Sequence, residues 1–253
     1  MPSPPPPFTA LNDVDAQLAS AGWAVLEAHT LSRLADTEVP QWQTWQPRWH
    51  DLPPDKYLKD GGKYRRRRHG SFVINGDTVQ LAPHRAHWQP VDYNALHGGI
   101  ERWFEPLAPG LVADSAWPRL LLALARRANV LRGVQPWYAE AHCFRIDTAG
   151  GIGRPTPEGA HRDGVDLVAV MLVSRHNVKG GETRVFDARA PQGVRFTLTQ
   201  PFSVLLLDDE RVIHETTPIQ PIQPAMPAWR DTLVITLRSG GFQDPEPDSA
   251  KTA

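Results

Sequence analysis

Two histidines and one aspartate form a set that could hold a metal ion. His161 and Asp163 are two positions apart, so an extended backbone would project both side chains to the same face. His214 follows much later, after an apolar run, where a returning antiparallel strand could bring it alongside. Two imidazoles and a carboxylate suit a borderline metal such as Fe(II), and they leave open positions on the other side of the ion. Taken alone, an H-x-D triplet more often marks solvated or core residues, so its surroundings must decide.

Size and composition exclude several functions. The 253 residues are 41% hydrophobic, and single β-barrels with added helices reach this length, so we expect one domain over residues 1–253. Lysine and arginine (27) nearly balance aspartate and glutamate (28), which gives no charge excess to attract nucleic acid or a membrane surface. Cys143 has no partner for a disulfide, and the chain shows neither a secretory signal nor a long apolar window. We expect a soluble, cytoplasmic protein with a small-molecule partner; the sequence leaves its oligomeric state open.

Longer motifs surround the three residues. They are the H-R-D-G-V-D run from His161, the R-H-N-V-K-G-G-E run from Arg175, the T-T-P that follows His214, and the R-D-T of a closing strand from Arg230. Together these motifs, within residues 157–238, resemble the 2-oxoglutarate (2OG) and Fe(II) dependent dioxygenases. Within that family they are most similar to the branch of bacterial free L-amino acid (isoleucine-type) hydroxylases and BsmA-like biofilm and stress proteins.

The resemblance implies a fold, a metal site and a reaction. The expected fold is mainly β with flanking helices, a double-stranded β-helix of the jelly-roll, cupin-like kind. The expected Fe(II) ligands are His161, Asp163 and His214, with 2OG as co-substrate and O₂ as oxidant. The implied reaction converts 2OG to succinate and CO₂ and hydroxylates a C–H bond, most simply that of a free aliphatic L-amino acid.

The co-substrate requires a cation in its pocket, because the distal carboxylate of 2OG would otherwise be buried unpaired. Arg230 and Thr232 alternate onto one strand face and resemble the pair with which many relatives hold 2OG. We expect them to bind it. Arg238 would lie roughly 26 Å further along an extended strand at ~3.3 Å per residue, too far to serve the same carboxylate. The competing interpretation is a surface ion pair between Arg230 and Asp231.

Other polar residues could bind the prime substrate. A zwitterion needs a cation and a hydrogen-bond acceptor, and Arg145 and His142 precede the metal motif. They fall on opposite faces of an ideal strand, so at most one can point inward, and structural roles for both remain open. The four arginines 65–68 are either a solvated strand edge or a strand that sends every second guanidinium inward to a carboxylate.

The remaining sequence patterns predict mostly helices in the N-terminal half of the chain and mostly strands in the C-terminal half. We expect a disordered leader over residues 1–10, a helix-rich part over 11–135 that packs on the barrel, and core strands over 136–240. Periodicity and caps predict helices at 13–21, 31–40, 93–107 and 115–132. Strands are predicted at 23–27, in the segment that follows the four arginines, and at 137–146, 166–173, 183–186, 194–199, 202–207, 211–215 and 232–238.

Three alternative functions stay open. The chain could be a non-catalytic BsmA-like stress or biofilm protein that binds a metabolite or partner on the same fold. It could be a metal-binding cupin without a need for 2OG, which an outward-pointing Arg230 would favour. It could also hydroxylate a macromolecule.

Overall fold

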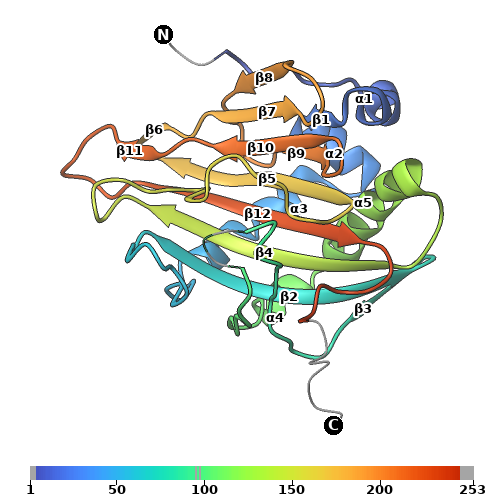
Figure 1. Ribbon diagram of the computed structural model, residues 1–253, viewed down its shortest axis with the longest axis horizontal. Helices are drawn as coiled ribbons and strands as arrows, with labels where there is room; N and C mark the ends of the chain where they lie inside the picture. Colours follow the sequence, from blue (N-terminus) through green and yellow to red (C-terminus); the bar gives the residue numbers. More distant parts are fainter. Residues whose placement is uncertain (1–3, 95, 97, 246–253) are drawn as a thin grey trace.

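The main structural element is a seven-stranded antiparallel sheet. The computed structural model describes residues 4–94, 96 and 98–245. The strands of the large sheet lie in the order β1-β9-β5-β12-β4-β2-β3 (Figure 1). In that order the strands are Trp23–Leu26, Val204–Asp208, Leu167–His176, Trp229–Arg238, Trp137–Asp147, Arg65–Asn75 and Thr78–Leu81. A three-stranded sheet runs β10-β7-β8 (Val212–Thr216, Thr183–Asp187, Gly193–Phe196), and β11 (Ile219–Pro221) pairs with β6 (Val178–Gly180).

The large sheet is covered on both faces. On one face, helices bury an apolar core that contains Trp42, Trp45, Trp49, Trp117 and Trp137. On the other face, a second apolar cluster joins strands β5 and β9 to the smaller sheet through Leu172, Leu205, Val185, Phe196 and Val212. Strands buried on both sides need continuous apolar runs, which is why β9 reads Val-Leu-Leu-Leu. Two facing antiparallel sheets of this kind confirm the predicted jelly roll.

The long helix α5 (Ala116–Arg132) confirms the prediction for residues 115–132. Pro118 lies in its first turn, where a missing N–H costs nothing. Gly133 ends the helix at φ 79°, and its N–H donates to the Asn129 carbonyl. The helix buries Leu120 and Leu124 against the sheet. The helix predicted at 13–21 is also confirmed, as α1 (Val14–Ala21) preceded by the 3₁₀ turn Leu11–Asp13.

Two helix predictions were wrong. Residues 93–107 contain no helix among the described residues, because the chain turns sharply there: a Cβ at Gly98 would lie 2.5 Å from the Asn94 carbonyl oxygen. The helix predicted at 31–40 is two helices, α2 (Ala28–Leu34) and α3 (Val39–Gln43). Asp36 has a positive φ of 48°, and Pro40 lies in the first turn of the second helix, which begins at Val39.

The N-terminal part does more than pack on the barrel. Strand β1 forms one edge of the large sheet, while β2 and β3 form the other. Phe8 makes a parallel bridge to Val25, and the Thr9 N–H donates to the Val25 carbonyl at 2.8 Å, so residues 8 and 9 are not part of a disordered leader. Residues 1–3 lie outside the described residues. The short strands β3, β6 and β11 were not predicted.

Three further short elements complete the fold. They are the 3₁₀ turn η2 (Gln46–Trp49), which contains the buried Trp49 and directly follows Trp45, the helix α4 (Pro109–Val112), and the bulge at Asp231 and Thr232 where β12 changes register against β5. Within the described part of the chain, no helix has both the length and the apolarity that a bilayer crossing requires.

Candidate active site

His161, Asp163 and His214 converge on one point. The Nε2 atoms of His161 and His214 each lie 3.9 Å from an Asp163 carboxylate oxygen, and the two imidazole centroids are 4.6 Å apart. Two ligand atoms at this separation can both lie about 2.1 Å from one ion. The three residues therefore fit a single metal ion, with ligand atoms all within 4.8 Å of one another.

The backbone holds the two histidines together. His161 donates its N–H to the His214 carbonyl at 3.0 Å and accepts the reciprocal bond at 3.0 Å, which attaches the His161 segment to the edge of β10. The His161 Nδ1 lies 2.9 Å from the Gly159 carbonyl, so Nδ1 carries the proton and Nε2 offers its lone pair to the metal. Burial holds the pKa of His214 well below its usual range, with a further decrease from His161, and keeps this imidazole neutral and ready to ligate.

Asp209 braces the loop that carries Asp163. Its carboxylate accepts the backbone N–H of Asp163 at 3.0 Å, of Gly164 at 2.7 Å and of Val165 at 3.1 Å. Burial, followed by repulsion from Asp163, raises the pKa of Asp209 to about 7. Asp209 was not among the residues that the sequence analysis selected. The side chain of Asp163 also accepts a bond from Gln89 Nε2 at 3.4 Å.

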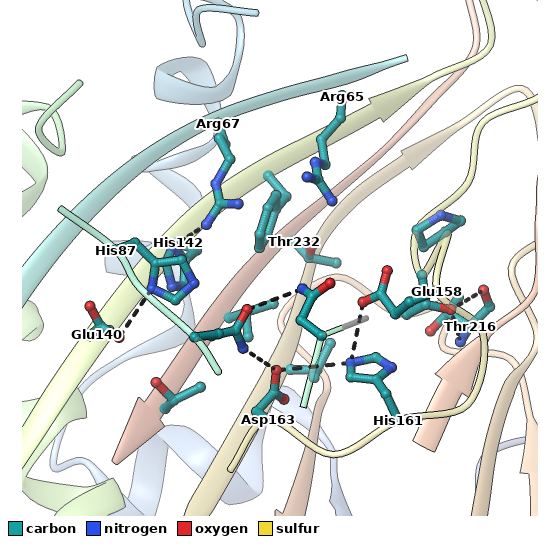
Figure 2. A pocket seen from close by; sticks show the side chains of 18 of the residues that line it. Arg65, Arg67, His87, Glu140, His142, Glu158, His161, Asp163, Thr216 and Thr232 are labelled. Atoms are coloured by element: carbon teal, nitrogen blue, oxygen red, sulfur yellow. Dashed lines mark hydrogen bonds and ion pairs between the residues drawn. The ribbon is translucent and has the colours of Figure 1, made fainter. Parts of the chain in front are cut away.

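A cavity extends from the metal ligands across the inner face of the large sheet. Strands β2, β4 and β12 are in register there, so their inward residues form rows about 7 Å apart, two residues at ~3.3 Å each. From the end nearest Arg230, the rows are Arg65-Ile146-Arg230, Arg67-Phe144-Thr232, His69-His142-Val234 and Ser71-Glu140-Thr236. Figure 2 shows Arg65 and Arg67 at the top of the view, His142 and His87 at the left, and Asp163 and His161 below them. His214 also lines this cavity.

Arg230 is a buried cation without a partner. It is 3% exposed, and its Nε and Nη2 atoms have no hydrogen-bond acceptor among the described residues. Burial, with repulsion from Arg175, lowers the pKa of Arg230 to about 10, so the guanidinium stays charged at neutral pH. Thr232 lies beside it, one row on, and both line the cavity. Asp231 projects to the opposite face, so the alternative of a surface pair between Arg230 and Asp231 does not hold.

The two residues considered for the prime substrate separate, as strand alternation requires. Arg145 lies outside the cavity lining. It donates from Nε and Nη2 to the two oxygens of Asp231, at 2.8 and 2.7 Å, and lies over the Trp229 ring. These contacts tie Arg145 to β12 on the face away from the cavity. His142 is 4% exposed and lines the cavity.

The four-arginine segment sends alternate side chains inward, which was one of the two interpretations. Arg65 and Arg67 are buried and line the cavity, and both face Asp55, at 2.7 and 3.8 Å. Arg66 and Arg68 point outward. Sequence reasoning missed Arg102 and Glu158, which also line the cavity, together with His87, Gln89 and Glu140. Glu158 lies three residues before His161, at the start of the motif region, and this proximity is the one signal that could have identified it. The others lie in loops or on a strand with no motif around them.

Three features together indicate a non-haem iron oxygenase that uses a 2-oxo acid. They are the facing sheets, the site of two histidines and one aspartate, and the buried arginine that has no ion-pair partner among the described residues. The chain belongs to the 2OG-Fe dioxygenase family, whose model matches residues 46–236. Members use Fe(II), 2OG and O₂, and the protein is an oxygenase of this kind.

Solved structures agree with this assignment. A bsmA homolog from Methylobium petroleophilum PM1 is 54% identical, with a TM-score of 0.89 over 94% of this chain and 96% of that one, which places the chain in the BsmA-like branch. IDO from Bacillus thuringiensis (16% identical, TM-score 0.72, 93% and 100% covered) and the Fe(II)/α-ketoglutarate-dependent dioxygenase TqaL (20%, 0.68, 92% and 90%) share the fold. Among curated proteins, no sequence matches.

Proposed function

We propose that this oxygenase hydroxylates a C–H bond of a free L-amino acid. The observation that carries the proposal is a second group of buried cations in the cavity, apart from Arg230. Arg65, Arg67 and Arg102 are 6%, 3% and 2% exposed, and each has a guanidinium nitrogen without a partner among the described residues. One cation is available for 2OG and three others surround the space beside it.

Fe(II) and 2OG would take the residues described above. His161, Asp163 and His214 would hold the ion, which when bound supplies the activation of O₂ at the expense of 2OG. Arg230, with the Thr232 hydroxyl, would pair with the distal carboxylate of 2OG, because a guanidinium matches a carboxylate in a two-pronged geometry. The protein's further task is to position the substrate and exclude water from the reacting atoms.

The second group of cations would bind the carboxylate of the substrate. Within the described chain, Asp55 is the one carboxylate within 4.0 Å of Arg65 or Arg67, and Arg102 has none. Three guanidiniums therefore face one close negative charge. Arg102 instead donates to Gln89 Oε1 at 2.9 Å, the residue that also contacts the metal ligand Asp163. A substrate carboxylate in this position would lie beside the iron.

The ammonium of an amino acid would find its acceptor in Glu158. This carboxylate lines the cavity and has one buried oxygen, Oε2, without a partner in the described part of the chain. Its other oxygen lies 3.6 Å from His161 Nε2, so the ammonium would also be held close to the metal. A zwitterion satisfies both sets of unpaired groups at once, whereas an uncharged substrate would leave them buried and unpaired.

The test is a titration followed by a turnover assay. Under anaerobic conditions, Fe(II) and 2OG should produce the metal-to-ligand charge-transfer absorbance, and free amino acids should perturb the band and stimulate succinate release in air. Substitution of Arg102 by Met should raise the amino acid concentration for half-maximal succinate release while leaving the 2OG requirement unchanged. A charge-transfer band that no amino acid perturbs would reject the substrate class and leave the oxygenase assignment intact.

The similarity to a bsmA homolog favours one second candidate, a stress or biofilm protein that binds a metabolite without turnover. The set of His161, Asp163 and His214 supports catalysis over this alternative, because binding a metabolite does not require a metal site with open positions beside the cavity. A cytoplasmic setting suits either function, since Fe(II) and the free, buried Cys143 thiol both persist under reducing conditions.

A further inference from the structure

We propose that His87 and His142 form a subsite in the cavity for an uncharged hydrogen-bonding group, a hydroxyl or a carboxamide, at the end of the substrate's side chain. This inference rests on the proposed function, because it names the class of amino acid that the cavity takes. The two imidazoles line the cavity, are 6% and 4% exposed, and have centroids 4.6 Å apart. One small group can therefore contact both rings.

The tautomer of His142 is set by Arg67. The Arg67 Nη2 atom lies 2.7 Å from His142 Nδ1, and a guanidinium only donates hydrogen bonds. Nδ1 must therefore accept, and the proton of the neutral ring must be on Nε2. Burial, with repulsion from Arg67, holds the pKa of His142 well below its usual range, so the ring is neutral. Its Nε2–H has no partner among the described residues.

The tautomer of His87 is opposite. Its Nδ1 lies 3.1 Å from Glu140 Oε2, and a carboxylate only accepts, so Nδ1 carries the proton. Burial alone would raise the pKa of Glu140, but His87 and His69 outweigh that effect and lower it overall, which keeps the carboxylate ionised. Burial lowers the pKa of His87 to about 4. The neutral ring then offers a lone pair at Nε2, which no described residue uses.

The cavity thus ends in one donor, His142 Nε2–H, and one acceptor, His87 Nε2. A carboxylate would face the lone pair of His87, and an ammonium would face the N–H of His142. A hydroxyl or a carboxamide can accept from the first and donate to the second, so it satisfies both. An aliphatic end would leave both atoms buried and unpaired, at a cost of about 1–3 kcal/mol for each.

A metal ion is the competing occupant, because His69, His87, Glu140 and His142 bring four ligand atoms within 4.8 Å. Two guanidiniums oppose it. Arg67 occupies His142 Nδ1, and Arg85 Nη1 lies 3.5 Å from Glu140. Glu140 already accepts from both His69 and His87. A cation would have to displace these bonds beside two positive charges.

The position of the subsite fits a short side chain. The backbone row of His142 is about 7 Å along the sheet from the row of Arg67 and roughly 13 Å from the row of Arg230, and the Arg67 side chain extends to contact the His142 ring at 2.7 Å. The subsite is thus too far from Arg230 to serve the 2OG carboxylate. It is near enough to the arginine group for one amino acid to span both.

The test compares amino acids of equal shape. The protein is loaded anaerobically with Fe(II) and 2OG, and L-asparagine is compared with L-leucine and L-threonine with L-valine. For each amino acid, the concentration that gives half of the maximal change in the charge-transfer absorbance is measured. The polar member of at least one pair should bind at least about 10-fold more tightly. In His142→Phe, which keeps the ring stack on His69 but lacks the donor, this preference should disappear. In the control His176→Phe, whose ring stacks on Trp229 outside the cavity, the preference should persist.

A second measurement does not depend on the amino acid class. Acetamide should shift the ring ¹⁵N signals of His87 and His142 in the holoenzyme, and acetate should not. If no amino acid perturbs the absorbance but acetamide gives these shifts, the proposed substrate class is wrong and the subsite stands. The subsite is overturned if the paired amino acids bind equally, if L-aspartate binds best, if acetamide gives no shift, or if the protein holds a second metal ion that His142→Phe releases.

Discussion

The substitution Arg230→Met separates the function of a buried charge from its effect on stability. Arg230 is 3% exposed and has two guanidinium nitrogens without partners among the described residues. An unpaired buried charge destabilises a folded protein. We therefore expect Arg230→Met to bind 2OG poorly while the protein without ligands unfolds at the same temperature or a higher one.

The magnitude follows from the hydrogen bonds that would be lost. A guanidinium that grips a carboxylate makes two charge-assisted bonds, each contributing about 1.5–3 kcal/mol. Methionine removes both bonds, so the loss is at least about 3 kcal/mol, or at least roughly a 100-fold rise in the Kd for 2OG. Because burial leaves the pKa of Arg230 at about 10, the effect should be constant between pH 6 and pH 8.

The assay is anaerobic titration of 2OG into the Fe(II) protein, read at the charge-transfer band, beside a thermal melt of the ligand-free protein. Arg175→Met is the matched control. Arg175 faces Arg230 across β5 and β12, but it donates to the Val178 and Gly180 carbonyls and does not line the cavity. The reasoning is refuted if Arg230→Met binds 2OG as tightly as the unaltered protein, or if Arg175→Met weakens 2OG binding as much.

Three further changes test the rest of the site. His161→Ala and Asp163→Ala should each abolish succinate release while circular dichroism shows an unchanged fold; residual turnover at high Fe(II) in both would remove them as ligands. Asp209→Asn should raise the Fe(II) concentration for half-maximal activity by about 10- to 100-fold, since an amide cannot accept the loop's three N–H groups equally well, and an unchanged Fe(II) titration would contradict this. Arg145→Ala should destabilise the protein by about 3–5 kcal/mol in urea unfolding, because it leaves Asp231 buried and unpaired at 2% exposure; a changed amino acid preference with unchanged stability would instead give Arg145 a substrate role.

Local rules predicted most of the strands and part of the site. Alternation along β12 placed Arg230 and Thr232 on one face, and alternation along β2 separated Arg65 and Arg67 from Arg66 and Arg68. The same rule separated His142 from Arg145 but could not say which face looks into the cavity. That choice depended on Asp231 from the neighbouring strand, which pairs with Arg145 and holds it outside.

The wrong helix predictions concern segments in which contacts with distant residues outweigh the local preference for a helix. Residues 93–107 have helical periodicity, yet Gly99 and Arg102 lie beside residues 87–89: Gly99 donates its N–H to the Gln89 carbonyl, and the Arg102 side chain donates to Gln89 Oε1 in the cavity. The turn at Gly98 and Gly99 and the burial of Arg102 therefore outweigh the helical periodicity of the segment. No spacing between residues 87, 102, 140 and 158 predicts that they meet.

The sequence by itself determined the class of protein, because His161, Asp163, His214 and Arg230 lie in motifs that resemble those of a known family. Only the tertiary structure decided what surrounds the iron. The register of β2, β4 and β12 brings Arg65, Arg67 and His142 together on the inner face, whereas Arg102, Glu158 and His87 reach the cavity from outside these strands. Register is a property of paired strands and of the buried charges that they share, so no single segment of the chain carries it.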